Sequence, residues 1–319
     1  MSGWMGSESL AGAAALRAYM LGPPRVEWGG QPLPLPRRQT RALLYRLAVR
    51  PEPVPREQLC FLFWPDTPES TARRNLTHLL THLRRALPEP DLLLIAEDCI
   101  GLDPRFAWSD VGDFERLCAA LPSSSLRLSS LPTLEEAESL QQAVDLYRGP
   151  FLAGFSLPGS PEFEAWADQA RYVWERLYLE ALAALMEGWA ASGEYDPAIA
   201  CARRYLETDE LAEDVHRRLI QFYAAVGDRR AALRQFERCT VVLERELGVS
   251  PLPETRAVYQ AVLAHQPVPR QAAPPAWTTL PGLDVPLVGQ CHSGLAGLPG
   301  AASPRQPFAG PWHLSERGI

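Results

Sequence analysis

Hydrophobic and polar positions follow two different patterns along the chain. Residues 16–35 are interrupted by Gly22-Pro23-Pro24 and Gly29-Gly30, which predicts short strands joined by tight turns. Apolar residues then recur at helical spacing, and an apolar strand, a polar turn and a second short strand follow them. The three predicted helices run from about Arg38 to Pro51, from Arg56 to Phe63 and from about Glu69 to Leu87, and the two strands occupy 92–95 and 99–102.

The order of these elements is strands, three helices and a terminal β-hairpin. It is the order of a winged helix-turn-helix of the OmpR type, in which the third helix enters the major groove of DNA. The sequence therefore predicts a small α+β domain over residues 16–110.

From Leu134 to about His265 the pattern is helical throughout, and it contains a repeat. Residues 193–199 (GEYDPAI) align with 227–233 (GDRRAAL) at a spacing of 34. Glycine at the turn, alanine where helices cross closely and large apolar residues before the turn are typical of tetratricopeptide repeats. We therefore expect a mostly α protein, in which the winged helix precedes an all-α, tetratricopeptide-like domain.

Composition divides the chain further. Residues 1–15 and the Pro/Gly-rich linker and tail at 266–319 have no sustained period, so both are expected to be disordered. The stretch 122–132 with its serine run is expected to form a loop before the helical pattern that starts at Leu134, and the helical domain as a whole is expected over 111–265.

Charge is distributed unevenly between the two predicted domains. Residues 17–110 hold 13 arginines against 11 carboxylates, a net of +2, whereas residues 111–265 hold 15 against 24, a net of −9. The first domain can therefore approach phosphate groups and the second is repelled by them. All 31 basic residues are arginine, which excludes a Walker A loop and Schiff-base chemistry because both need lysine.

The third predicted helix holds the candidate DNA-reading residues. Its leucines recur at three- and four-residue steps, which indicates one buried stripe. Its other faces offer arginine, threonine and histidine side chains suited to guanine edges and phosphates. These candidates are Arg73, Arg74, Thr77, His78, Thr81, Arg84 and Arg85. For the first helix we expect contacts to the phosphate backbone from Arg38, Thr40 and Arg41. A solvated amphipathic helix explains the same pattern without DNA.

Other chemistry finds little support. His78 and His82 have metal-ligand spacing, but no nearby Glu or Cys completes a site, so no metal is expected. Neither a GxSxG motif nor a phosphate-binding loop is present, so we expect no enzyme activity and no cofactor. Without a signal peptide or a membrane-length apolar run, the protein is expected to be soluble and cytoplasmic.

The chain resembles the SARP-type antibiotic regulatory proteins of actinomycetes. The winged-helix resemblance rests on residues 16–49, on REQLCFLFWPD at 56–66 and on ARRNLTHLLTHLRRAL at 72–87. LYRGPFL at 146–152, the region of Trp166 and ELGVSP at 246–251 are similar to the bacterial transcriptional activation domain of these regulators. The resemblance implies transcriptional activation, with double-stranded promoter DNA and RNA polymerase as partners. It also implies that a homodimer binds direct repeats.

Two departures leave alternatives open. Many relatives have a Gly-Tyr-Arg-Leu wing, but here residues 99–102 read CIGL and the wing tip is Glu97-Asp98. Pro286-Leu287-Val288-Gly289 resembles the start of a nucleotide-binding domain that lacks its P-loop. The alternative is therefore a protein-interaction module whose winged helix no longer binds DNA, or a shortened form of a larger nucleotide-binding regulator.

Overall fold

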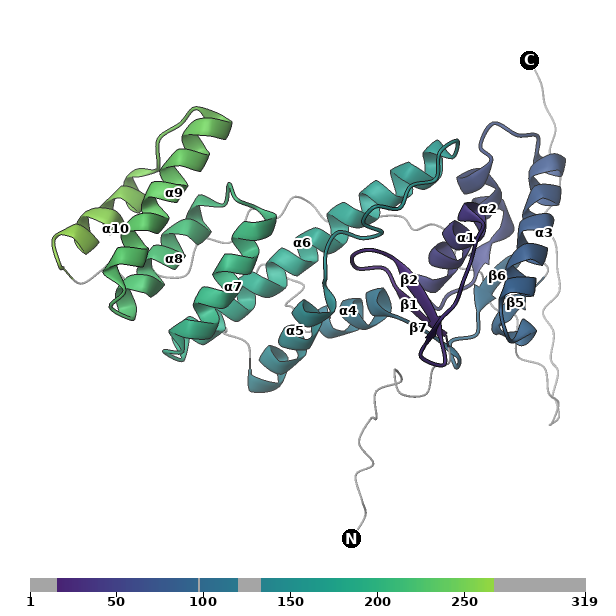
Figure 1. Cartoon of the computed structure of the whole chain (residues 1–319), viewed down its shortest axis with the longest axis horizontal. Helices are drawn as coiled ribbons and strands as arrows, with labels where there is room; N and C mark the ends of the chain where they lie inside the picture. Colours follow the sequence, from purple (N-terminus) through teal and green to yellow (C-terminus); the bar gives the residue numbers. More distant parts are fainter. Residues whose placement is uncertain (1–15, 97, 120–132, 267–319) are drawn as a thin grey trace, which may run out of the picture.

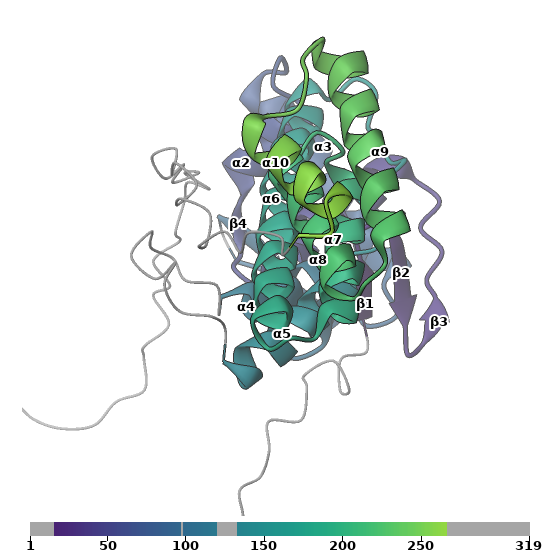
Figure 2. The same cartoon turned by 90° about the vertical axis from the view of Figure 1, so that its left-hand side faces the viewer.

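The computed structural model describes residues 16–96, 98–119 and 133–266. The expected disordered N-terminus, the loop at 122–132 and the tail beyond Gln266 lie outside the described residues. Figure 1 shows an elongated molecule, with α3 at one end and α9 and α10 at the other. Figure 2, turned by 90°, places α9 and α10 in front of the same N-terminal elements.

The N-terminal half consists of short strands and four helices. Its elements are β1 (Leu16–Tyr19), β2 (Arg25–Trp28), β3 (Gln31–Pro32), α1 (Arg38–Ala48), β4 (Val54–Pro55), α2 (Arg56–Phe63), α3 (Glu69–Ala86), β5 (Leu93–Ile95), β6 (Cys99–Leu102), β7 (Ala107–Ser109) and α4 (Asp110–Cys118). The C-terminal half is helical and contains α5 (Leu134–Leu146), α6 (Pro161–Ala191), α7 (Tyr195–Thr208), α8 (Glu213–Ala225), α9 (Arg229–Leu247) and α10 (Pro253–Leu263). The mostly α fold with a small N-terminal sheet region is confirmed.

Two small sheets frame the first three helices. The first has the order β3-β2-β1-β7, with β1 antiparallel to β2 and parallel to β7. Between β2 and β3, Gly29 and Gly30 have φ of 54° and 80°, the left-handed values that a two-residue hairpin turn requires. The second sheet has the order β4-β6-β5, so the β5–β6 hairpin pairs with the strand that leads into α2. This pairing brings the hairpin beside α2 and α3.

The helical stripe expected in α3 is buried. Leu76, Leu79, Leu80 and Leu83 are at most 5% exposed, and they pack in the same core as the leucines of α1. The opposite face of α3 is left in solvent. The amphipathic period thus fixes which side chains of α3 another molecule can reach.

The 34-residue repeat of the C-terminal half is also visible in the backbone. Gly193 before α7 and Gly227 before α9 both have φ of +81°, and each N–H donates to the carbonyl three residues earlier, at 3.2 and 3.1 Å. Glycine adopts this left-handed conformation without the steric penalty of a Cβ atom. The second helices of the pairs α6/α7 and α8/α9 therefore start in the same way.

The start of α6 packs against the N-terminal half. The Phe163 ring lies 5.8 Å from that of Phe63 in α2, and the Ser160 hydroxyl donates to the Phe63 carbonyl at 3.3 Å. Nearby, the Tyr45 and Phe155 rings meet edge to face at 5.2 Å. The 31 residues of α6 then continue to α7, so one helix connects the two halves (Figure 1).

Candidate nucleic-acid interface

The solvent face of α3 brings together the side chains expected to read DNA. Among the described residues, Arg74, Arg84 and Arg85 have neither an ion-pair nor a hydrogen-bond partner, and all three are exposed. Arg73 differs, because its Nε donates to the Glu69 carboxylate at 2.8 Å one turn earlier. Three guanidinium groups of this helix thus remain available to an external anion.

Threonine and histidine complete this face. The Thr77 hydroxyl donates to the Arg73 carbonyl and the Thr81 hydroxyl to the Thr77 carbonyl, each at 2.9 Å. Each hydroxyl oxygen keeps its acceptor capacity, so these threonines can accept a hydrogen bond from the edge of a base. His78 lies exposed beside them.

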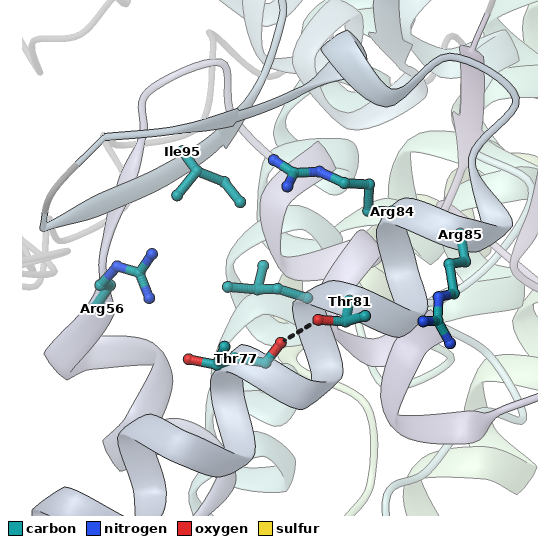
Figure 3. Close-up of a pocket in the computed structure, with 7 residues that line it drawn as sticks. Arg56, Thr77, Thr81, Arg84, Arg85 and Ile95 are labelled. Atoms are coloured by element: carbon teal, nitrogen blue, oxygen red, sulfur yellow. Dashed lines mark hydrogen bonds between the residues drawn. The ribbon is translucent and has the colours of Figure 1, made fainter.

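A hollow of about 230 Å³ lies between α3, the start of α2 and the β5–β6 hairpin. Thr77, Thr81 and Arg84 line one side, and Arg56 and Ile95 come from the other two elements (Figure 3). Figure 3 shows the guanidinium groups of Arg56 and Arg84 on different walls of this hollow. The hollow therefore presents positive charge from two separate helices.

Arg56 is a candidate that the sequence pattern missed. Its backbone N–H donates to the Asp98 carbonyl at 2.8 Å, which ties the start of α2 to the hairpin. Its Nε is buried and has no hydrogen-bond partner within the described part of the chain. A buried donor without an acceptor is unfavourable, so the Arg56 side chain is incompletely hydrogen-bonded in the described part of the chain.

The α1 residues expected at the phosphate backbone occupy three different environments. Arg38 is exposed, as that role requires. Arg41 is half-buried, with its guanidinium 5.6 Å from the centroid of the Phe155 ring. Thr40 is only 3% exposed, and its hydroxyl lies inside the protein, so the expectation that it contacts phosphate is wrong. It shares the inner face of α1 with Leu43 and Leu47, at steps of three and four residues.

The two histidines of α3 lie in different surroundings, with His78 exposed and His82 half-buried. His82 Nε2 lies 2.6 Å from Nη1 of Arg37, which joins α3 to the residue preceding α1. Desolvation and then Arg37 lower the pKa of His82, which favours the neutral ring that can accept this hydrogen bond. Over residues 16–96, 98–119 and 133–266, no three His, Cys, Asp or Glu side chains gather as metal ligands.

The hairpin that would form the wing is apolar on its accessible side. All four residues of β6 are buried, whereas Leu94 and Ile95 of β5 are 43% and 37% exposed. Asp98 is exposed at the turn, and Glu97 lies outside the described residues. Leu94 and Ile95 suit van der Waals contact with a sugar or a base methyl group rather than ionic contact.

In the described part of the chain, no helix has the length and apolar character needed to span a membrane.

Comparisons with known proteins cover both halves. The family model described as bacterial transcriptional activator domain matches residues 110–263. The transcriptional regulatory protein MoaR1 of Mycobacterium bovis is 27% identical over 270 residues, which are 80% of this chain and 82% of MoaR1. The transcriptional regulatory protein EmbR of Mycobacterium tuberculosis is 26% identical over 275 residues, which are 81% of this chain and 67% of EmbR.

A solved structure shows the same fold. It is that of Mycobacterium tuberculosis EmbR in complex with a low affinity phosphopeptide, with a TM-score of 0.58 and 24% sequence identity. The match covers 80% of this chain and 66% of the solved chain. The order of the small sheets, the first helices and the helical repeats is thus an arrangement found in another protein.

Proposed function

We propose that the chain is a SARP-type transcriptional regulator with a bacterial transcriptional activator domain, and that it activates transcription by binding double-stranded promoter DNA through the exposed face of α3. In this proposal α3 lies in the major groove and the hollow with Arg56 receives a backbone phosphate. The helical repeats contact RNA polymerase or a partner protein, and the chain performs no catalysis of its own.

The observation that carries the proposal is the set of unpaired arginines on α3. A structural surface helix commonly neutralises its arginines with carboxylates one turn away, as Arg73 does with Glu69. Arg74 and Arg85 have no such partner in the described residues, and they lie eleven residues apart along the helix, which is three turns. Guanidinium groups so placed suit bidentate contact with guanine or charge-assisted contact with phosphate.

Contacts from α1 complete the proposed interface. Arg38 is exposed at the first residue of α1, and Arg37 just before it is hydrogen-bonded to His82 of α3. This hydrogen bond connects the start of α1 to the recognition face of α3. Arg38 can therefore contact a phosphate next to the groove that α3 occupies. Binding of two copies to direct repeats stays a prediction.

The test measures DNA binding by the full chain. A preferred duplex is selected in vitro from a random pool, and fluorescence anisotropy then follows its binding over a range of salt concentrations. Replacing Arg74 and Arg85 by alanine is expected to weaken binding by at least about tenfold. Each phosphate contact that is lost is also expected to reduce the salt slope by about one.

The matched control replaces two exposed arginines far from α3, Arg230→Ala and Arg256→Ala. This double variant removes the same formal charge as the Arg74/Arg85 variant. If it binds DNA as the wild type does, the loss in the Arg74/Arg85 variant comes from the position of the arginines and not from net charge. Equal binding by the wild type and the Arg74/Arg85 variant would refute the assignment of α3. No selection of any duplex by the wild type would instead favour the interaction module whose winged helix no longer binds DNA.

A further inference from the structure

A second positively charged groove lies in the helical repeats, at the end of the molecule opposite α3 (Figure 1). It has a volume of about 400 Å³ and lies between α7, α8 and α9. Arg203 of α7 and Arg234 and Arg238 of α9 line it, together with one carboxylate, that of Glu207. Residues 111–265 around it have a net charge of −9. The groove, with three arginines and one carboxylate, is therefore positively charged within a negatively charged domain.

The arginines are arranged for an anion from outside. The Arg203 Nε donates to the Tyr223 hydroxyl at 2.8 Å, and its guanidinium lies 5.6 Å from the centroid of that ring. These contacts hold the side chain and leave its two terminal nitrogens as donors. Arg234 and Arg238 lie one turn apart on α9, both exposed, and have no partner within the described ranges. Three guanidinium groups therefore face one groove from two helices.

Gln235 also lines the groove, and a hydrogen bond to His216 fixes the orientation of its side-chain amide. His216 is buried, with Nε2 3.0 Å from the Glu210 carbonyl and Nδ1 2.6 Å from Nε2 of Gln235. A carbonyl only accepts, so Nε2 of the ring bears the hydrogen and Nδ1 accepts from the Gln235 amide. Burial lowers the pKa of His216, which agrees with this neutral ring. The remaining polar atom of Gln235 is its Oε1, an acceptor.

We propose that this groove binds an acidic segment of a partner protein, with side-chain carboxylates on Arg203, Arg234 and Arg238. Apolar side chains of the segment pack on Leu206 and Tyr223, and Gln235 accepts a backbone N–H. The inference rests on the proposed function, in which the repeats are the protein-contacting half, and it names the chemistry of that partner.

The surrounding charge favours a peptide over nucleic acid. A duplex carries one negative charge per 1.7 Å or so of its length, and most of them would face the acidic surface outside the groove. A short acidic segment places its few charges on the arginines alone, within the roughly 8 Å over which charges interact at physiological salt. Nucleic-acid backbones also have no N–H groups, so they cannot donate the N–H hydrogen bond that Gln235 can accept.

The experiment uses the full chain and a fluorescein-labelled peptide, acetyl-Gly-Leu-Glu-Glu-Leu-Asp-Glu-Gly, in anisotropy titrations. Its neutral counterpart, with Gln and Asn in place of the acids, is the control probe. The groove variant is Arg234→Glu with Arg238→Glu. The matched variant, Arg230→Glu with Arg256→Glu, makes the same charge change on α9 and α10 at residues that do not line the groove.

We expect the wild type and the matched variant to bind the acidic peptide and not the neutral one. The groove variant should bind it at least tenfold more weakly, and added salt should weaken wild-type binding. Equal affinity of the two variants, or no binding by the wild type up to about 1 mM peptide, would overturn the proposal. Displacement of the peptide from this groove by duplex DNA, lost in the groove variant, would also overturn it, in favour of nucleic acid.

Parallel titration of the selected duplex separates this inference from the proposed function. Groove variants should keep DNA binding, and the Arg74/Arg85 variant should keep peptide binding. Failure of DNA binding with intact peptide binding would therefore count against α3 and leave the groove standing.

Discussion

Replacing Phe163 by alanine tests whether the two halves of the regulator are held together by their aromatic contact. Phe163 is 1% exposed, and its ring lies 5.2 Å from Trp166, 5.8 Å from Phe63 and 6.1 Å from Phe155. Its neighbours come from α2, α6 and the loop before α6, so truncation leaves a cavity that no single element can close. Truncations of buried phenylalanine cost about 3 to 5 kcal/mol.

This magnitude can be measured by thermal unfolding. For a chain of this size each kcal/mol lowers Tm by about 2 to 4 °C, so the Phe163→Ala variant should unfold roughly 6 to 20 °C below the wild type. The control is Tyr172→Ala, at a position on the same helix that is 56% exposed. It should change the free energy of unfolding by less than about 0.5 kcal/mol.

Amide hydrogen exchange shows which segments lose stability in the Phe163→Ala variant. Amides of α2 and of the first turns of α6 should exchange faster in the Phe163→Ala variant, because these segments lose their shared packing. A Tm for Phe163→Ala within 2 °C or so of the Tyr172→Ala value would refute the reasoning that this cluster joins the halves.

Two further predictions concern a buried acid and a turn. Burial raises the pKa of Asp110 from 3.8 to about 6, although its carboxylate accepts backbone N–H groups of Met20 and Leu21 at 2.8 and 3.0 Å. The folded state then binds more protons between pH 3.8 and 6, so its stability falls by up to about 3 kcal/mol as pH rises through that window. Urea titrations should show this fall in the wild type and not in Asp110→Asn, and parallel pH curves would contradict it. At Gly227, where φ is +81°, alanine should cost about 1 to 2 kcal/mol by the same assay, whereas Ala225→Gly at the exposed end of α8 should cost no more than about 1 kcal/mol. No loss at Gly227 would show that the turn tolerates a side chain.

The sequence predicts the bounds and the buried face of α3 well because the signal for both is local. Leucines at three- and four-residue steps determine which face of α3 is buried, and the exposed arginines follow from that. The same rule, applied to α1, places Thr40 on the inner face with Leu43 and Leu47. The burial of Thr40 was therefore readable from the sequence, and its expected phosphate contact conflicted with the helical period.

Arg56 and the arginine groove depend on contacts between distant parts of the chain. Arg56 reaches the hollow because β4 pairs with β6, and no local pattern specifies that pairing. The 34-residue repeat indicates that α7 and α9 are equivalent, but the convergence of Arg203 with Arg234 depends on how both pack against α8. A periodic sequence shows which face of a helix is buried, whereas the partner of that face is a property of the tertiary structure.

The long helix α6 separates the surface proposed to bind DNA from the groove proposed to bind a partner protein. Its 31 residues span about 45 Å, with its start packed on α2 and its later turns packed on α7. That length is several times the roughly 8 Å over which charges interact at physiological salt, so the carboxylates of α8 to α10 act only weakly on α3. The groove lined by Arg203, Arg234 and Arg238 thus lies at the end of the molecule opposite α3, the helix proposed to bind DNA (Figure 1). In the two proposals taken together, a partner docked in the groove is held at a set distance from DNA bound by α3, provided that the aromatic contact at Phe163 stays intact.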